Sequence, residues 1–333
     1  MSTREMIRDV AQAITRDIVF QEGLTPSWSV DFINGGLSNG LSLSRASGAN
    51  YTNQAGAMVT AASNVARLDY NPTTLAPRGL LVEEQRTNSL LNSAAPANQT
   101  VTLAANTYTL WVVGSGSCAV AAGTAVGTGF GIATAGTPLT FTVSTTGNVV
   151  FTVSGSLSAF QCENGAFATS FITTTTAAAT RAADICTGSI GSWLNVNEGT
   201  LVVEYMRGAS AASAVIFRLD NGSDGTVVAH GAGTTGGTFA NRVAFTTDVS
   251  MVFTGVSAAQ TIVKQAGAYR LNDYAGSRNG SAVITDTAAS MPVGLSGVRL
   301  GSRGADSWLN GWIRKVAYYP QRLSNAQLMQ LTA

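Results

Sequence analysis

Acidic side chains are the residues that could cleave a glycoside, because that reaction uses two carboxylates roughly 5 to 10 Å apart. The chain has 18 Asp and Glu residues. The pattern of a Glu and an Asp at alternate positions on one strand, which would place two carboxylates side by side, is not found. Glu204 is a lone acid in the apolar stretch 199–206. The sequence therefore predicts that the protein is not an enzyme.

Other reactive residue types are equally isolated. His230 is the only histidine and stands in a glycine-rich turn, which predicts an ordinary loop residue. Residues 220–225 resemble a calcium loop, but the ligand spacing is wrong and favours a hairpin turn. The three cysteines, Cys118, Cys162 and Cys186, form no CxxC motif, so we expect three small buried hydrophobes in a reducing compartment. No metal site and no cofactor are predicted.

Sugar binding needs a different constellation, in which an aromatic face covers the C–H side of a sugar ring and polar groups satisfy its hydroxyls. One region supplies both. Its candidate residues are Tyr269, Asn272, Asp273, Tyr274, Arg278 and Asn279, with Arg303, Asp306 and Trp308 opposite. Trp308 and Trp312 could equally belong to a core, because alternation gives a strand one inward face. The region is thus either a glycan site or a purely structural cluster.

Short apolar alternations rich in Val and Thr, separated by Gly turns, predict an all-β chain that positions these residues. Charged residues make up 11% of the sequence, against about 25% in average proteins. The net charge of +1 favours neither nucleic acid nor an anionic membrane as a partner. No stretch is long and apolar enough to predict membrane insertion.

The middle of the chain is nearly uncharged. Between Arg86 and Arg181 the only charged residue is Glu163. Apolar and polar residues still alternate along the segment as they do in strands, which predicts a small β-sandwich with Thr on its surface. Such a neutral surface would either pack closely between copies of the chain or simply face solvent. Before it, we expect structural ion pairs of Arg67 with Asp69, and of Arg86 with Glu83 or Glu84.

Both ends of the chain carry helical patterns. At residues 3–18 the apolar positions recur at spacings of three and four: Ile7, Val10, Ile14 and Ile18. That helix would either pack on its own domain or serve in docking or oligomerisation. At the other end, Ser324 and Gln327 form a capping box that predicts a short closing helix. We therefore expect a helix at 1–22, a β-sandwich at 23–180 ending in a Thr/Ala linker, and a second sandwich at 181–333.

Three blocks of sequence resemble bacteriophage virion proteins of the tail-fibre and head-fibre type. The first runs from residue 43 to 88 and contains Arg-Leu-Asp-Tyr-Asn-Pro and Gly-Leu-Leu-Val-Glu-Glu-Gln-Arg-Thr-Asn. The second covers 160–184, and both resemble the opening and closing of a carbohydrate-binding-like jelly roll. The third covers 193–331 and resembles a concanavalin-A-like, or laminin-G-like, domain whose closing element includes Trp308-Leu-Asn-Gly-Trp312.

The resemblance implies a function as well as a fold. It implies two jelly-roll sandwiches preceded by a short amphipathic helix, in a fibre, spike or decoration protein that contacts host-surface glycan. The protein would be made in the bacterial cytoplasm and reside on the virion surface. It would form a homotrimer and bind other virion proteins (capsid, portal or tail) through its N-terminal region. The alternatives are a decoration or adaptor protein that binds no sugar, and a polysaccharide depolymerase, which the missing carboxylate pair disfavours.

Overall fold

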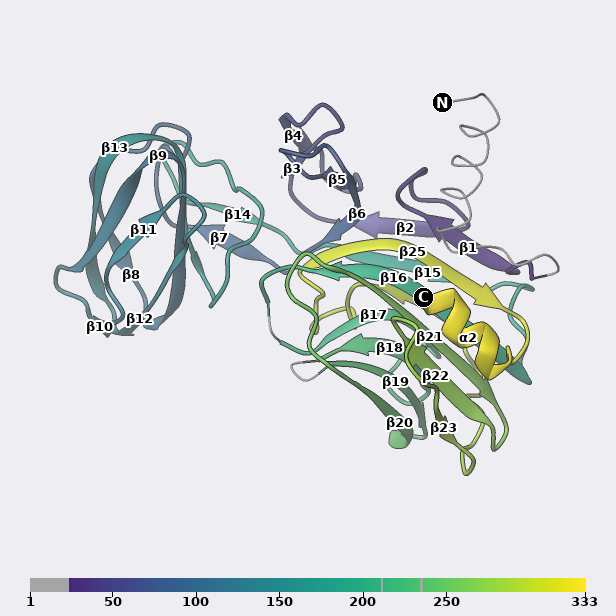
Figure 1. Ribbon diagram of the computed structural model, residues 1–333. Coiled ribbons are helices and arrows are strands. Elements are labelled where there is room, and N and C mark those ends of the chain that lie inside the picture. The colour runs from purple at the N-terminus through teal and green to yellow at the C-terminus, as the bar shows by residue number, and fades with distance from the viewer. Residues whose placement is uncertain (1–23, 211, 234–235) are drawn as a thin grey trace, which may run out of the picture.

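The computed structural model describes residues 24–210, 212–233 and 236–333. Within these ranges the chain is mostly β, with antiparallel sheets and one described helix, α2 (Asn325–Thr332), near the C-terminus (Figure 1). The predicted helix carrying Ile7, Val10, Ile14 and Ile18 lies outside the described residues. In the described ranges no helix has the length and apolar character that a bilayer span requires.

Two large sheets form a β-sandwich. The strands of the first sheet follow one another in this order: β23 (Ile284–Asp286), β22 (Tyr274–Arg278), β21 (Ile262–Arg270), β16 (Glu198–Arg207), β25 (Gly311–Tyr319), β6 (Pro77–Val82) and β5 (Leu68–Tyr70), with β1 (Trp28–Asp31) also paired to β25. The second sheet has this order: β2 (Leu41–Ser44), β15 (Ile185–Ser189), β24 (Gly297–Leu300), β17 (Ala214–Asp220), β18 (Val227–Ala232), β19 (Gly236–Val243) and β20 (Thr246–Thr254).

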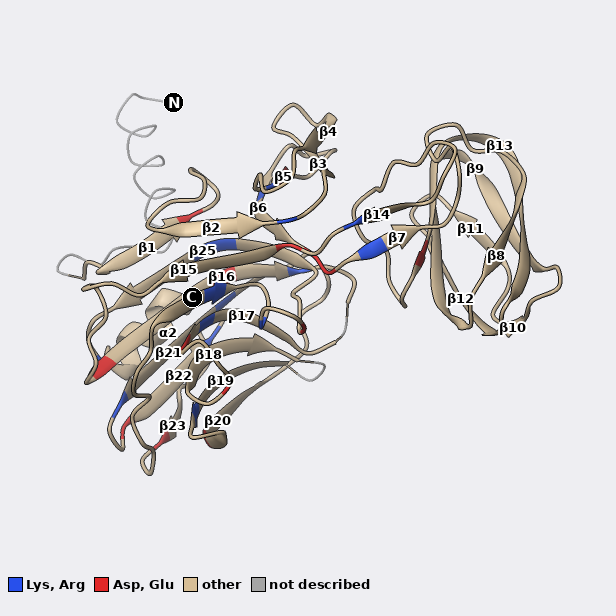
Figure 2. Ribbon diagram, turned by 180° about the vertical axis from the view of Figure 1, so that it is seen from behind, with Lys and Arg blue, Asp and Glu red and all other residues tan. Residues whose placement is uncertain are grey.

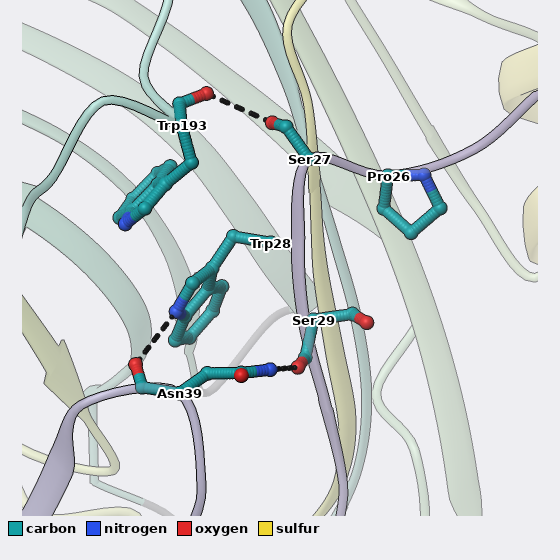
Figure 3. A pocket seen from close by; sticks show the side chains of 6 residues that line it. All are labelled: Pro26, Ser27, Trp28, Ser29, Asn39 and Trp193. Carbon is teal, nitrogen blue, oxygen red and sulfur yellow. Dashed lines mark hydrogen bonds between the residues drawn. The ribbon is translucent and has the colours of Figure 1, made fainter.

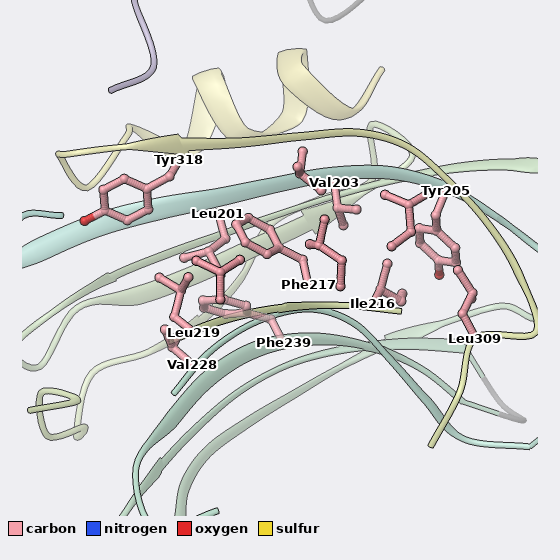
Figure 4. Close-up of a cluster of buried hydrophobic side chains, with 14 of the residues drawn as sticks. Leu201, Val203, Tyr205, Ile216, Phe217, Leu219, Val228, Phe239, Leu309 and Tyr318 are labelled. Atoms are coloured by element: carbon pink, nitrogen blue, oxygen red, sulfur yellow. The ribbon is translucent and has the colours of Figure 1, made fainter. Parts of the chain in front are cut away.

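The core fills the space between these two sheets. Figure 4 shows Leu201 and Val203 of β16 together with Phe217 and Leu219 of β17, all of them fully buried. Val202, between the two β16 residues, points the other way and packs in a second cluster with α2. Both faces of β16 are therefore covered, which explains why this strand is an almost unbroken apolar run. Burying each such side chain contributes roughly 1.5–3 kcal/mol.

The C-terminal helix begins as predicted. The backbone N–H of Gln327 donates to Ser324 Oγ, and the backbone N–H of Ser324 donates to Gln327 Oε1 at 2.8 Å. The capping box is confirmed because every partner in it lies within three residues, so no tertiary information was needed to find it. Leu328 and Leu331 then anchor the helix on the first sheet.

A third sheet is built from residues 86–181 and lies to one side of the sandwich (Figure 1). Its strands are β7 (Arg86–Asn88), β8 (Gln99–Leu103), β9 (Asn106–Ala122), β10 (Val126–Thr128), β11 (Ile132–Thr134), β12 (Leu139–Thr145), β13 (Gly147–Asn164) and β14 (Ala179–Arg181). Its separate core includes Leu110, Phe141 and Phe151. Away from β7 and β14, Figure 2 shows this sheet almost without charged residues.

The two longest strands of this sheet, β9 and β13, are paired along most of their length around a bulge. Gly114 faces that bulge with a φ of +118°, and a Cβ there would stand 2.4 Å from the carbonyl oxygen of Ser156. Only glycine combines this backbone conformation with so close an approach.

The sheets do not follow the predicted division at residue 180. Strands β1, β2, β5 and β6, all before residue 83, pair within the same two sheets as strands from 185 to 319. The sandwich is therefore assembled from both ends of the described chain, and residues 86–181 form an insertion. The predicted Thr/Ala linker ends in β14, which pairs with β7. A small hairpin of β3 (Ala49–Thr52) and β4 (Met58–Ala61) completes the fold.

Eight charged side chains meet where the insertion joins the sandwich, and we call them the junction network. They are Arg45, Arg67, Glu83, Glu84, Arg86, Glu163, Arg181 and Asp184. Four positive charges balance four negative ones, as burial requires.

Asp184 and Glu83 are the centres of this network. Asp184 pairs with Arg45 at 2.9 Å and with Arg67 at 2.5 Å, and all three side chains are fully buried. Glu83 pairs with Arg67 at 2.8 Å and with Arg181 at 3.1 Å. Burial disfavours the Glu83 carboxylate, but the charges of Arg181 and Arg67 outweigh it and lower its pKa to about 2.

The predicted ion pairs have mixed outcomes. Arg86 does pair with Glu84. The pairing of Arg67 with Asp69 is wrong, because Arg67 turns to Glu83 and Asp184. Asp69 instead lies 3.5 Å from Arg78 and accepts a hydrogen bond from the indole of Trp312 at 2.8 Å.

Candidate functional site

The aromatic residues predicted to stack on sugar are buried. Tyr269 is 1% exposed, and its hydroxyl lies 3.2 Å from that of Tyr318. Tyr274 is fully buried and donates to the carbonyl of Ser290 at 2.7 Å. Both rings belong to the core between the sheets, so neither offers a face to a ligand. Side chains alternate between the two faces of β21 and β22, and both tyrosines fall on the face that points into the core.

The polar residues beside them mostly have structural roles. Arg278 is 7% exposed and donates to the carbonyl of Gly255 at 2.5 Å. Asn272 and Asn279 have positive φ values of 54° and 49°, which are typical of turn residues. Asp273 accepts from Arg322 at 2.9 Å and from Arg270 at 2.7 Å.

The second half of the predicted site lies elsewhere. Arg303 and Asp306 pair with each other at 2.8 Å in the loop between β24 and β25. Trp308 packs against the main core and donates its indole N–H to the carbonyl of Asp184 at 3.0 Å. Strands β21 and β16 stand between β22 and β25 in the first sheet. The fold therefore separates the two halves of the predicted site.

The residues weighed for catalysis are engaged in the fold. Glu204 accepts a hydrogen bond from Arg314 Nε at 2.5 Å. His230 is fully buried, with Nε2 2.9 Å from the carbonyl of Leu201, and burial lowers its pKa to about 4. The expectation of a plain loop histidine is wrong, because His230 lies in β18 and faces the core.

One serine motif lies outside these candidates. Residues 36–40 have Gly-x-Ser-x-Gly spacing, but they form a loop between two strands, whereas a nucleophile elbow joins a strand to a helix.

The cysteines are buried and unpaired, as expected. Burial raises the pKa of Cys118 to about 11 and that of Cys186 to about 12, so both are thiols at neutral pH. In the part of the chain that the structure describes, His, Cys, Asp and Glu side chains form no group able to hold a metal ion.

A different pocket combines aromatic and polar groups at the surface of the sandwich (Figure 3). Its volume is about 420 Å³, and its lining residues are Pro26, Ser27, Trp28, Ser29, Asn39 and Trp193. We call it the tryptophan pocket. Trp28 opens β1, whereas Trp193 lies in the loop between β15 and β16.

Stacking holds the two indoles in place. Their ring centroids are 5.3 Å apart with an interplanar angle of 24°, and the ring of Phe217 stacks on Trp28 at 5.9 Å. Trp28 is only 5% exposed, whereas Trp193 is half-buried and contacts Tyr318 edge-on. Trp193 is therefore the indole that remains accessible to a ligand.

Hydrogen bonds fix the polar wall of the pocket. The carbonyl of Asn39 accepts from Trp28 Nε1 at 3.0 Å, and Ser27 Oγ donates to the carbonyl of Trp193 at 2.8 Å. The side-chain amide of Asn39 donates to the carbonyl of Ser29, which leaves its Oδ1 without a partner among the described residues. Trp193 Nε1 likewise has no partner there. An acceptor, a donor and a partly open ring suit a hydroxylated ring.

The sequence did not point to this pocket. Trp28 and Trp193 lie far apart in the chain and meet only because β1 joins the sheet of the later strands. The sole local signal is Asn39, whose φ of 52° reflects the Asn-Gly step at a turn.

No protein-family model matches the chain, and neither does any curated protein sequence. Among solved structures, a Ruminococcus gnavus IT-sialidase CBM40 bound to alpha2,3 sialyllactose matches at a TM-score of 0.36 and 16% identity, over 41% of this chain and 84% of that one. A SAP-like pentraxin from Limulus polyphemus matches at 0.31 and 12%, over 41% and 70%. The receptor-binding domain of botulinum neurotoxin mosaic serotype C/D matches at 0.35 and 10%, over 44% and 38%.

The chain is thus distantly similar in structure to lectin-like and pentraxin β-sandwich domains. Each of these three matches covers less than half of this chain. At such low identities and TM-scores, no ligand and no residue role is transferred from them.

Proposed function

We propose that this chain is a structural protein of a bacteriophage particle, a fibre, spike or decoration protein that presents a glycan-binding sandwich. The glycan part rests on the tryptophan pocket, which is lined by both the half-buried ring of Trp193 and Asn39 with its free Oδ1. The virion part rests on the sequence blocks at 43–88, 160–184 and 193–331. In this proposal the protein binds host sugar rather than cleaving it, because the sequence lacks a Glu and an Asp at alternate positions on one strand.

Glycan binding is tested on a glycan array, followed by calorimetry on any sugar that binds. Asn39→Gly removes the amide while glycine accepts the φ of 52°. Asn272→Gly is the matched control, because Asn272 is also exposed with a φ of 54° but lies away from the tryptophan pocket.

We expect Asn39→Gly and Trp193→Phe to weaken binding roughly tenfold, by about the value of one hydrogen bond, while Asn272→Gly leaves it unchanged. If only Asn272→Gly lost binding, the glycan site would lie at the loop between β21 and β22 and not at the tryptophan pocket. An array without any bound sugar would favour a decoration or adaptor protein, a reading supported by the burial of Tyr269 and Tyr274.

The proposal also includes a homotrimer attached to the particle through residues 1–22. It rests on the apolar stripe of Ile7, Val10, Ile14 and Ile18. Light scattering on the full chain and on a chain without residues 1–22 tests the trimer. If the trimer persists without residues 1–22, assembly belongs to the β-sheets, and the segment is left for docking. A protein that is monomeric in both forms and absent from purified virions would refute the virion proposal.

A further inference from the structure

The outer face of the second sheet carries a small hollow of about 150 Å³. Its floor is made of Ala229 on β18 and Ala240 on β19, which are cross-strand partners. The next partner in the same row is Arg218 on β17. Two alanines in a row of larger residues create the depression, and its size suits a single small group rather than a drug-sized ligand.

Arginines surround the hollow, and they differ in how fully they are paired. Arg218 is 3% exposed and held by Asp220 at 2.8 Å and Asp224 at 2.6 Å, so it is a fixed part of the wall. Arg242 is half-buried and reaches only the carbonyl of Asp224, at 3.5 Å. Among the described residues no carboxylate lies within ion-pair distance of Arg242. Its charge is available to a ligand.

The charged residues that line the hollow are all arginines: Arg218, Arg242 and Arg303. The acids paired with them do not line it: Asp220 and Asp224 pair with Arg218, and Asp306 pairs with Arg303. Arg303 is 38% exposed in its side chain and pairs with Asp306 at 2.8 Å and with Asp224 at 3.6 Å. Both ion pairs are solvated, so an anion can compete for Arg303.

An exposed aromatic ring lies at the tip of the hairpin that also carries Arg242, a lining residue of the hollow. Phe245 is 74% exposed at the tip of the hairpin between β19 and β20. Its backbone N–H donates to the carbonyl of Gly225 at 2.9 Å, and a Cβ on Gly225 would lie 3.2 Å from its ring. The ring therefore lies against residues 221–226, the loop that also holds Asp224.

The backbone at Phe245 is strained. Ala244 and Phe245 have φ values of 49° and 67°, in the left-handed region that favours glycine or asparagine. A large apolar ring kept in solvent on a strained turn contributes little to folding. Strain of this kind concentrates at ligand sites.

We propose that this hollow is a second ligand site, which binds a carboxylate-bearing sugar residue through Arg242 and Arg303 while Phe245 covers the sugar ring. Guanidinium groups bind planar carboxylates through paired hydrogen bonds, and an aromatic face covers C–H groups. The site does not depend on the tryptophan pocket. It adds acidic saccharides as a ligand class for the glycan-binding function proposed above.

The test uses the full chain and a panel of uronic-acid and sialic-acid oligosaccharides, each beside its neutral methyl ester. We expect the acids to bind at least about tenfold tighter than their esters. Arg242→Gln should remove that preference. Arg270→Gln is the matched control, since its side chain is 56% exposed on the first sheet. Trp193→Phe should leave the preference intact, which separates this site from the tryptophan pocket.

Phe245→Gly separates a ligand role from a folding role. Glycine accepts the φ of 67°, so the variant should unfold at a higher urea concentration yet bind the acids more weakly. A variant that is both more stable and unimpaired in binding would refute the role of the ring. The proposal fails if no acid outbinds its ester, or if Arg270→Gln weakens binding as much as Arg242→Gln. It also fails if inorganic sulfate displaces a bound acidic oligosaccharide as effectively as a second acidic oligosaccharide does. That result would indicate a patch that binds any anion.

Discussion

Protonation of His230 should destabilise this protein in mildly acidic solution. The imidazole is fully buried, Nε2–H donates to the carbonyl of Leu201, and Nδ1 lies 3.3 Å from the side-chain amide nitrogen of Gln265. Burial penalises the imidazolium more strongly than the backbone hydrogen bonds to Leu201 and Thr238 favour it. Burial lowers the pKa of His230 to about 4 from its ordinary 6.5.

The sign and size of the effect follow from linkage. Between pH 6.5 and about 4 the unfolded chain binds a proton that the folded protein excludes, so stability is lost as the pH falls through this window. The pKa difference is 6.5 − 4 = 2.5. At about 1.36 kcal/mol for each pKa unit, the full loss is about 3 kcal/mol, of which about 2 kcal/mol is lost by pH 5.

The assay benefits from a single histidine in the sequence. The imidazole proton resonance in the NMR spectrum reports one titration, which should have its midpoint near pH 4 while the protein is folded. In parallel, the free energy of unfolding in urea should fall more between pH 7.5 and pH 5 in the wild type than in His230→Gln. The carboxylates titrate in both proteins, so their contribution drops out of this comparison. A midpoint near pH 6.5 would mean that water reaches the ring, and it would refute the reasoning.

Three further predictions concern the junction network and the closing helix. Asp184→Asn should cost about 3–5 kcal/mol, because it leaves Arg45 and Arg67 buried with one fewer partner, whereas Asp306→Asn on the surface should cost at most about 1 kcal/mol in the same urea experiment. The wild type should lose stability as the pH falls from 4.5 to about 2, because the unfolded chain protonates Glu83 while the folded protein keeps it ionised. Glu83→Gln should lack this contribution in acid titrations followed by circular dichroism. Ser324→Ala should lower the free energy of unfolding by about 0.5–2 kcal/mol, and equal stability of the two proteins would show that the cap is dispensable.

Some local patterns in the sequence predicted the structure, and others were overridden by long-range pairings. The capping box at Ser324 and the pairing of Arg86 with Glu84 involve residues within three positions of each other. Arg67, in contrast, passes over nearby Asp69 to reach Asp184, more than a hundred positions away. Alternation shows that a strand has an inner face, but it does not say which sheet that strand joins. The division at residue 180 could not be corrected from the sequence for that reason.

The candidate sites differ in the same way. Tyr269 and Tyr274 are aromatic residues of the kind that stack on sugars, yet their positions in β21 and β22 place both side chains on the inner face of the sheet. Trp193 looks unremarkable in the sequence and becomes accessible beside Trp28 only after β1 pairs with β25. Phe245 carries no sequence signal of strain, because its left-handed backbone follows from the register of β19 and β20.

The distribution of charge connects the fold to the proposed binding. The junction network balances four arginines against four acids, so it contributes no net charge at the root of the insertion. Beyond the junction the inserted sheet is nearly uncharged (Figure 2). The hollow on the second sheet, in contrast, is lined by three arginines, and one of them, Arg242, forms no ion pair among the described residues. With a net charge of only +1 over the whole chain, long-range attraction of anions is weak. Selectivity for an acidic sugar would therefore have to come from short-range contacts with Arg242, Arg303 and Phe245. It should consequently persist at a salt concentration that abolishes diffuse electrostatic binding.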